Sequence, residues 1–477
     1  PDKIPEMIGL LTRRLEPTAL DRKKIELLSS RRVLKDNDAE YVKKLGSQLL
    51  IFRGRGGTGK TVHLLRLAHE LYIDHDARIL ILTYNKALVA DLRRLLALMG
   101  ICDFYGRRAI EIRTVHSFLY RLRQYLDNKQ QPPEQFIGEY PSHRKLILEQ
   151  LGLIKEPSQV LIDKAPDLFD WDYIFIDEAQ DWPDEERQIL FSLYDYRRFV
   201  IADGVDQYVR SEKPTDWRRA VDVEHRQYVT LRKSLRLKAG LCTFAMAFAR
   251  ALGLEDWRLE KDEDIYGGRV IVIEGNYSDD RTLHDELVER TRAAGNQPID
   301  MLFCVPPSLV KHEKKEQAPT RSAQDQDQAY SIVARRFQKW GYDTWDAVSE
   351  ETRGSYPTSV EQLRIVQYDS CRGLEGWMCI NLRFDELYDY KRESYPQPDQ
   401  RKFPFMEDEK AADLFAARWL MIPLTRAIDT LVIQINSVDH PVGRALQAAH
   451  QECGDLVDWR TLSPKSEKAL ALSGQPG

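Results

Sequence analysis

Short apolar runs alternate with longer stretches of helical apolar spacing along the first part of the chain. A run that is apolar throughout is typical of a strand buried on both faces of a parallel sheet, and the longer stretches fit helices that cover such a sheet. The predicted strands comprise residues 49–52, 78–84, 109–113, 173–176 and 199–202. This pattern predicts an α/β domain with a parallel sheet flanked by helices.

A second series of the same kind follows. Its predicted strands comprise residues 229–231, 269–273, 299–304, 363–367, 378–382 and 431–435, with helices at 238–252 and 329–340. The polar stretch 311–328 lacks periodicity, so we expect a mobile loop there, and the stretch 385–409, rich in Tyr, Pro and charge, predicts a second long connection. In chain order, the expected regions are a helical lead-in at 1–45, a first α/β domain at 46–225 with a small insertion at about 119–168, and a second α/β domain at 226–477.

A glycine-rich segment follows the first predicted strand. Residues 54–61 fit the G-x-x-x-x-G-K-S/T pattern of a phosphate-binding loop, and helical spacing continues to residue 72. In such a loop, backbone N–H groups surround phosphate oxygens, the lysine reaches the outer phosphates and the last hydroxyl ligates Mg²⁺. The candidate nucleotide-binding residues are Gly54, Gly56, Gly57, Thr58, Gly59, Lys60 and Thr61. A chance glycine turn is the alternative, and the flanking strand and helix favour the nucleotide site.

Polar residues follow two other predicted strands. Asp177 and Glu178 come directly after residues 173–176, and ligands of open α/β sheets bind outside the carboxyl ends of the strands. Asp177 is therefore placed to hold Mg²⁺ through water, and Glu178 to orient and deprotonate the attacking water. Gln207, in the segment 203–207 after the next strand, could sense the outermost phosphate. A solvated acidic turn and an ordinary surface turn are the respective alternatives.

Composition adds a few limits. The 477 residues are 43% hydrophobic and 30% charged with a net charge of −5, so a nucleic acid would need a local basic groove. No apolar stretch reaches the roughly 18 residues that span a bilayer, and no secretory signal is visible, which favours a soluble cytoplasmic protein without a membrane partner. Six scattered cysteines favour a reducing compartment over a zinc site or disulfide framework. The chain begins with Pro1 rather than Met, which leaves room for an upstream domain.

Eight motifs together resemble those of superfamily 1 helicases of the UvrD/Rep type, in the order typical of that family. The similar segments are 54–61 (the first motif), 82–87 (T-x-x-N-K-A), 114–118 (T-x-H-x-F), 177–181 (D-E-x-Q-D), 203–207 (G-D-x-x-Q, with Ala202 for the usual glycine), 231–236 (L-x-x-N-Y-R), 370–376 (K-G-L-E) and 424–427 (T-R-A). The resemblance implies two tandem RecA-like P-loop domains, with ATP and Mg²⁺ in the cleft between them.

The resemblance also implies roles for residues of the second domain. Arg236 and Arg426 would reach the γ-phosphate as arginine fingers, which in other phosphoryl-transfer enzymes contribute about 10³ to 10⁵ in rate. Glu375 would lie at the sugar or phosphate edge of the nucleotide. For either arginine alone, a surface salt bridge is the alternative.

The family's path for single-stranded nucleic acid also has matching positions. They are Thr83, Asn85, Thr114, His116 and Phe118. Basic residues cluster nearby in the sequence: Arg93, Arg94, Arg107, Arg108, Arg113, Arg121 and Arg123. Cations that attract phosphates and rings that stack on bases suit a flexible single strand. Core packing of His116 and Phe118, and a solvated basic helix face, are the alternatives.

Three departures limit the resemblance. The family's adenine-reading glutamine, upstream of the P-loop, has no clear match. The aromatic cluster after the G-D-x-x-Q block is altered, which leaves Tyr208 and Trp217 as candidate stacking groups. The insertions are too small for a large accessory domain, and a motor without one could translocate yet unwind poorly.

We therefore expect an ATP-dependent helicase or translocase, with the resemblance favouring single-stranded DNA and 3′-to-5′ movement. The alternative is a regulatory ATPase that responds to a nucleic acid or to a protein partner such as a nuclease, with little unwinding. A purely structural role would require Lys60 and Glu178 to be dispensable.

Overall fold

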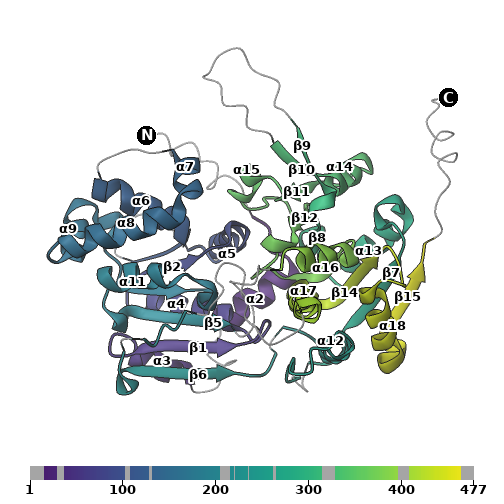
Figure 1. The fold of residues 1–477 in the computed structure, drawn as a ribbon, viewed down its shortest axis with the longest axis horizontal. Coiled ribbons are helices and arrows are strands. Elements are labelled where there is room, and N and C mark those ends of the chain that lie inside the picture. Colours follow the sequence, from purple (N-terminus) through teal and green to yellow (C-terminus); the bar gives the residue numbers. More distant parts are fainter. Residues whose placement is uncertain are drawn as a thin grey trace, which may run out of the picture. The chain divides into compact units, whose positions relative to one another are not determined.

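The computed structural model of the protein describes ten segments of the chain. They are residues 15–29, 37–101, 108–127, 132–204, 215–219, 221–234, 236–261, 265–313, 328–395 and 408–462. The chain divides into two compact units, each an α/β domain (Figure 1). The first domain comprises residues 21–233, and the second comprises residues 15–20 together with the described residues from 234 onward.

The first domain is built on a six-stranded sheet in which all neighbouring strands are parallel. The strands are β1 (Leu49–Gly54), β2 (Arg78–Thr83), β3 (Ala109–Thr114), β4 (Tyr173–Ile176), β5 (Phe199–Gly204) and β6 (Arg226–Leu231), in the spatial order β3-β2-β4-β5-β1-β6. The helices of this half of the chain are α2 (Ala19–Ser29), α3 (Asn37–Lys44), α4 (Lys60–Asp74), α5 (Lys86–Leu98), α6 (Val115–Asp127), α7 (Pro133–Gly138), α8 (Tyr140–Leu153), α9 (Pro157–Lys164), α10 (Pro166–Phe169) and α11 (Asp184–Leu193).

The central strands of this sheet are covered on both faces, which explains why β1, β2, β4 and β5 are mostly apolar, whereas the edge strand β6 is only partly buried. On one face, Leu49 and Ile51 belong to a core that also contains residues of α6, α8 and α11. On the other face, Phe52 stacks on His63 of α4, with 5.1 Å between ring centroids. Apolar residues of β1 therefore pack on both faces of the sheet.

The second domain contains a seven-stranded parallel sheet and an antiparallel pair of strands (Figure 1). Its strands are β7 (Arg269–Glu274), β8 (Met301–Val305), β9 (Val310–Glu313), β10 (Gln328–Ser331), β11 (Thr344–Asp346), β12 (Leu363–Gln367), β13 (Gly376–Asn381), β14 (Ala427–Ile435) and β15 (Val457–Thr461), and the large sheet has the order β11-β12-β8-β13-β14-β7-β15. Its helices are α12 (Ala239–Ala251), α13 (Arg281–Ala293), α14 (Ile332–Lys339), α15 (Glu350–Arg353), α16 (Phe384–Glu393), α17 (Asp408–Leu424) and α18 (Pro441–Cys453). The expectation of two α/β domains with parallel sheets flanked by helices is confirmed.

Residues just before and within α2 have partners in different parts of the sequence. The Thr18 hydroxyl, 2% exposed, donates to Oδ1 of Asp300 at 3.0 Å. Three residues later, Asp21 accepts two hydrogen bonds of 2.8 Å from the guanidinium of Arg94 on α5. The described part of the expected lead-in at 1–45 contains α2 and α3, and its segment 15–20 groups with the second domain.

Some sequence-based expectations about elements are wrong. The predicted strand 229–231 was assigned to the second domain, but β6 pairs with β1 in the first sheet. An apolar run indicates that a strand forms, and it does not say which strand is its neighbour. Helix α16 occupies the first part of the expected connection at 385–409, to Glu393, and β10 occupies the start of the expected helix at 329–340. Among the described helices, none combines the length and apolar character needed to cross a membrane.

A histidine lies in the core of the second domain. His284 of α13 is fully buried, its Nδ1 is 3.0 Å from the Tyr277 hydroxyl, and its ring stacks on Phe337 with centroids 4.2 Å apart. Burial lowers the pKa of His284 to about 3, and the neighbouring Asp285 carboxylate only partly opposes this effect. The imidazole is therefore neutral in the native protein across the physiological range.

This histidine should make stability depend on pH. The unfolded chain binds a proton at His284 below about pH 6.5, whereas the native state does so only near pH 3. Stability is therefore retained above pH 6.5 and lost as the pH falls, by about 2 kcal/mol at pH 5 from this group. Urea unfolding between pH 5 and 8 should show that His284→Leu weakens this dependence, while His312→Gln, on exposed β9, leaves it intact. An unchanged dependence in His284→Leu would contradict the assignment.

Candidate nucleotide site

The carboxyl edge of the first sheet collects most of the candidate residues. Register places Gly54 at the end of β1 beside Gly204 of β5 and Leu231 of β6. Thr83 at the end of β2 lies beside Thr114 at the end of β3. Because parallel strands end at one edge, motifs far apart in sequence meet there.

The glycine-rich loop takes the conformation that its residue types allow. Gly57 and Gly59 have φ values of 85° and 84°, in the left-handed region that favours glycine. At Gly54, a Cβ atom would lie 2.7 Å from the carbonyl oxygen of Leu231, so a larger residue would not fit beside β6. Helix α4 begins at Lys60, directly after the loop. The local structure is therefore the strand, loop and helix expected for a phosphate-binding site.

Lys60 and Thr61 connect the loop to the next motif. The Lys60 ammonium, 6% exposed, donates to the carbonyl oxygens of Gly54 at 2.8 Å and Arg55 at 3.1 Å. The Thr61 hydroxyl donates to Oδ2 of Asp177 at 3.0 Å, although the two residues are 116 positions apart. A hydroxyl and a carboxylate oxygen in contact are donors that Mg²⁺ prefers, so this pair fits the expected metal ligands.

Two carboxyl groups in this site have limited contact with solvent. Burial, together with the neighbouring Glu178 carboxylate, raises the pKa of Asp177 to about 6, and the Lys60 ammonium opposes that rise. Burial also raises the pKa of Asp203 to about 6, and Arg53, 3.6 Å away, opposes it. A buried carboxyl group and a partly buried one, both with raised pKa values, would be better accommodated beside a bound cation, which again fits Mg²⁺.

The turn after β4 is held by side chains that were not predicted to act there. Glu178 has φ 52°, which is uncommon for a residue other than glycine. Indole N–H groups bind the turn: Trp182 donates to the Asp177 carbonyl at 3.3 Å, and Trp217 donates to the Ala179 carbonyl at 2.8 Å. Gln180, 1% exposed, donates from Nε2 to Oε2 of Glu178 at 2.8 Å. Gln180 belongs to the D-E-x-Q-D motif, but a motif does not show whether a residue is buried or which groups it contacts.

The second domain brings its three candidate residues together at the amino ends of β13 and β14. Arg236 Nε donates to Oε2 of Glu375 at 2.6 Å, and its Nη1 lies 3.4 Å from the Thr425 carbonyl. Arg426, 2% exposed, donates from Nε to the Ile422 carbonyl at 2.9 Å. Arg236 and Glu375 form a salt bridge with each other, as in the alternative for Arg236, although the pair is largely buried and not on the surface.

The candidate nucleic-acid residues divide by burial and hydrogen bonding. Asn85 caps α5, since its side chain accepts from the Ala87 N–H at 3.0 Å, and Thr114 accepts from the Ser117 N–H at 3.2 Å. Thr83 is fully buried. His116 is partly exposed, with its ring 4.5 Å from that of Tyr140. Phe118 is 2% exposed and its ring packs in the core of the first domain, as the alternative interpretation of this residue expected. The other four remain candidates.

Several arginines of the expected basic cluster are engaged within the first domain. Arg94 pairs with Asp21, Arg113 with Glu111, and Arg123 with Asp127. Arg93 donates to the carbonyl of Ile112 at 2.9 and 3.2 Å, and Arg108 lies 3.7 Å from Asp76. Clustering in sequence therefore overestimates the positive charge that a nucleic acid could meet.

Three further expectations concern the segment after β5. Two of them fall on Gln207 and Tyr208, which lie outside the described residues, as does Arg107 of the expected basic cluster. Trp217 is 2% exposed and packs against Trp182, with ring centroids 5.8 Å apart. The expectation that Trp217 could stack on a base is wrong, because its ring and its N–H are both used within the domain.

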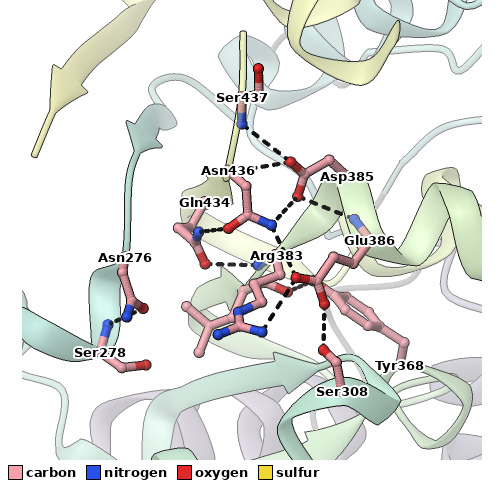
Figure 2. Close-up of polar contacts among 11 residues, drawn as sticks. Asn276, Ser278, Ser308, Tyr368, Arg383, Asp385, Glu386, Gln434, Asn436 and Ser437 are labelled. Atoms are coloured by element: carbon pink, nitrogen blue, oxygen red, sulfur yellow. Dashed lines mark hydrogen bonds and ion pairs between the residues drawn. The ribbon is translucent and has the colours of Figure 1, made fainter. Parts of the chain in front are cut away.

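A polar cluster that the sequence did not suggest lies at the carboxyl ends of β8, β13 and β14 (Figure 2). Asp385 of α16 accepts hydrogen bonds from the backbone N–H groups of Asn436 at 2.7 Å and Ser437 at 3.3 Å. Glu386 accepts from Asn436 Nδ2 at 3.0 Å and from the Ser308 hydroxyl. The polar groups of this cluster are hydrogen-bonded to one another, and the bonds join α16 to the segments that follow β8 and β14.

Searches with protein-family models and against curated proteins find no match to this chain. Among solved structures, the chain is similar to the crystal structure of arterivirus nonstructural protein 10, a helicase. The two are 12% identical with a TM-score of 0.32, and the match covers 86% of this chain but only 64% of the viral protein. A likeness at this level assigns no function, so the function has to be argued from the site itself.

Proposed function

We propose that the protein is an ATPase that acts on nucleic acid as a superfamily 1 helicase or translocase of the UvrD/Rep type. The observation that carries the proposal is the contact between Thr61 and Asp177, with Lys60 and Glu178 directly beside them in sequence. This contact joins a phosphate-binding loop to an acidic turn, and these are the two parts that P-loop enzymes use to bind a nucleotide with its metal.

The residues have distinct roles in the proposed reaction. Lys60 and the loop N–H groups would bind the phosphates, and Thr61 and Asp177 would hold Mg²⁺, which would neutralise charge on the phosphate oxygens. Glu178 would accept a proton from the attacking water. The second domain would supply Arg236 and Arg426 as arginine fingers and Glu375 at the nucleotide's edge, and Gln207 would sense the outermost phosphate.

The proposed substrate is single-stranded DNA, with movement from 3′ to 5′. The motif order supports this choice, and Thr83, Asn85, Thr114 and His116 are the candidate contacts. Thr83 and Thr114 end adjacent strands at the same edge as the nucleotide site, which would let one domain contact both ligands.

ATP hydrolysis measured with single-stranded DNA, single-stranded RNA and duplex DNA tests the proposal. We expect single-stranded DNA to stimulate hydrolysis most, and displacement of a labelled strand from tailed duplexes to show the direction. If no single-stranded nucleic acid stimulates hydrolysis, the proposal is wrong. Hydrolysis that responds only to a protein partner such as a nuclease, without strand displacement, would instead identify a regulatory ATPase.

A further inference from the structure

Gln180 is a buried glutamine whose amide contacts two parts of the candidate site. Its Nε2 donates to the Glu178 carboxylate, and its Oε1 accepts the N–H of Gly204, the last residue of β5. The side chain is 1% exposed. One amide group therefore connects the candidate catalytic base to the end of the neighbouring strand.

Gly204 provides the space that this amide occupies. A Cβ atom at Gly204 would lie 2.5 Å from both Cδ and Nε2 of Gln180, closer than non-bonded atoms approach. The position needs glycine because of this close contact. Any larger residue would displace the amide from Glu178.

The hydrogen bond from Gln180 restricts the orientation of the Glu178 carboxylate. Glu178 is 6% exposed, and its backbone is in the left-handed region, so solvent and ordinary turn geometry do little to position its carboxylate. A general base works only when its oxygen lies within hydrogen-bond reach of the proton that it accepts. A neighbour that fixes the carboxylate therefore affects the rate of proton transfer and not the binding of phosphates.

We propose that Gln180 is a positioning residue for Glu178, and that Gly204 is required because it lets Gln180 reach that carboxylate. The inference rests on the proposed ATPase function. The amide of Gln180 orients Glu178 and couples that orientation to β5, so a shift of this strand's carboxyl end moves the base.

The first test compares steady-state ATP hydrolysis by Gln180→Met and Gly204→Ala with the unmodified protein. Methionine keeps most of the side-chain volume but forms neither hydrogen bond. We expect kcat to fall about tenfold to a hundredfold, at the low end of a general base's contribution, while KM for ATP changes less than about twofold. Gln188→Ala is the matched control, because Gln188 also donates to a carboxylate, that of Asp184, but on the exposed surface of α11.

A double-mutant cycle separates positioning from a general loss of structure. In Gln180→Ala the amide that Gly204→Ala would displace is absent. Adding Gly204→Ala to Gln180→Ala should therefore lower kcat less than about twofold further, although it is harmful alone. Independent structural damage would instead make the two losses multiply.

The outcomes distinguish the two proposals. If the unmodified protein hydrolyses ATP and both single variants keep kcat within about twofold, the positioning role is overturned while the proposed function stands. A loss that appears mainly in KM, or multiplies in the double variant, also overturns it. If the unmodified protein hydrolyses no ATP under any condition, the proposed function fails and this inference fails with it. Thermal unfolding and ATP binding verify that each variant is folded.

Discussion

Glu178→Gln is expected to bind ATP normally and to hydrolyse it about 10² to 10⁴ times more slowly than the unmodified protein. An amide has nearly the size of a carboxylate, but it cannot accept the proton of the attacking water. Lys60, Thr61 and Asp177 are unchanged in this variant, so the groups proposed to bind phosphate and metal remain. The new side chain can still accept the hydrogen bond from Gln180 Nε2 through its own oxygen.

Two measurements check this expectation. Titration with ATP should give similar dissociation constants for both proteins, and single-turnover hydrolysis should show the loss in the chemical step. Glu149→Gln makes the same change on an exposed position of α8 and should leave hydrolysis unaltered. Near-normal turnover by Glu178→Gln would refute the assignment of Glu178 as the base.

Arg236→Ala should reduce hydrolysis by about 10³-fold or more, with a smaller effect on ATP binding, if Arg236 is an arginine finger. Such a residue stabilises charge that develops on the transferring phosphoryl group, so its loss affects the transition state most. Arg236→Lys should recover only part of the rate, since an ammonium does not reproduce the planar guanidinium. In the structure, Arg236 is oriented by Glu375 at 2.6 Å, with 15% and 18% of the two side chains exposed.

The control for Arg236 is another arginine paired with a carboxylate in the same domain. Arg392 donates to Asp413 at 2.7 Å, and its side chain is 42% exposed on α16. Arg392→Ala should leave hydrolysis unchanged. Activity of Arg236→Ala within about twofold of the unmodified protein would show that the pair with Glu375 is only a salt bridge.

The sequence predicted most of the strands because a parallel sheet covered on both faces needs continuous apolar runs. β4 and β12 have the predicted limits, and the glycine-rich loop has the predicted strand and helix on either side. Contiguous motifs also predict that Lys60, Asp177 and Glu178 lie at one edge of the sheet, because the end of a parallel strand fixes that edge, and Thr61 contacts Asp177 there.

The relations that the sequence did not predict are those between residues distant in the chain. The partner of β6, and the role of Trp217 in fixing the turn at Ala179, depend on packing that no local pattern encodes. The same holds for charge, since Arg94 is neutralised by Asp21, 73 residues earlier in the chain. The candidate site residues were thus easier to predict than the contacts that orient their side chains.

The hydrogen bond between Thr18 and Asp300 has a consequence for biosynthesis. Thr18 is translated 282 residues before its acceptor, whereas all of residues 21–233 are complete well before Asp300 appears. At a synthesis rate of roughly 5–20 residues per second, Asp300 is added to the chain about 15 to 60 seconds after Thr18. Synthesis of the first domain is therefore complete on the ribosome before Thr18 can meet Asp300, and this hydrogen bond forms only late in translation.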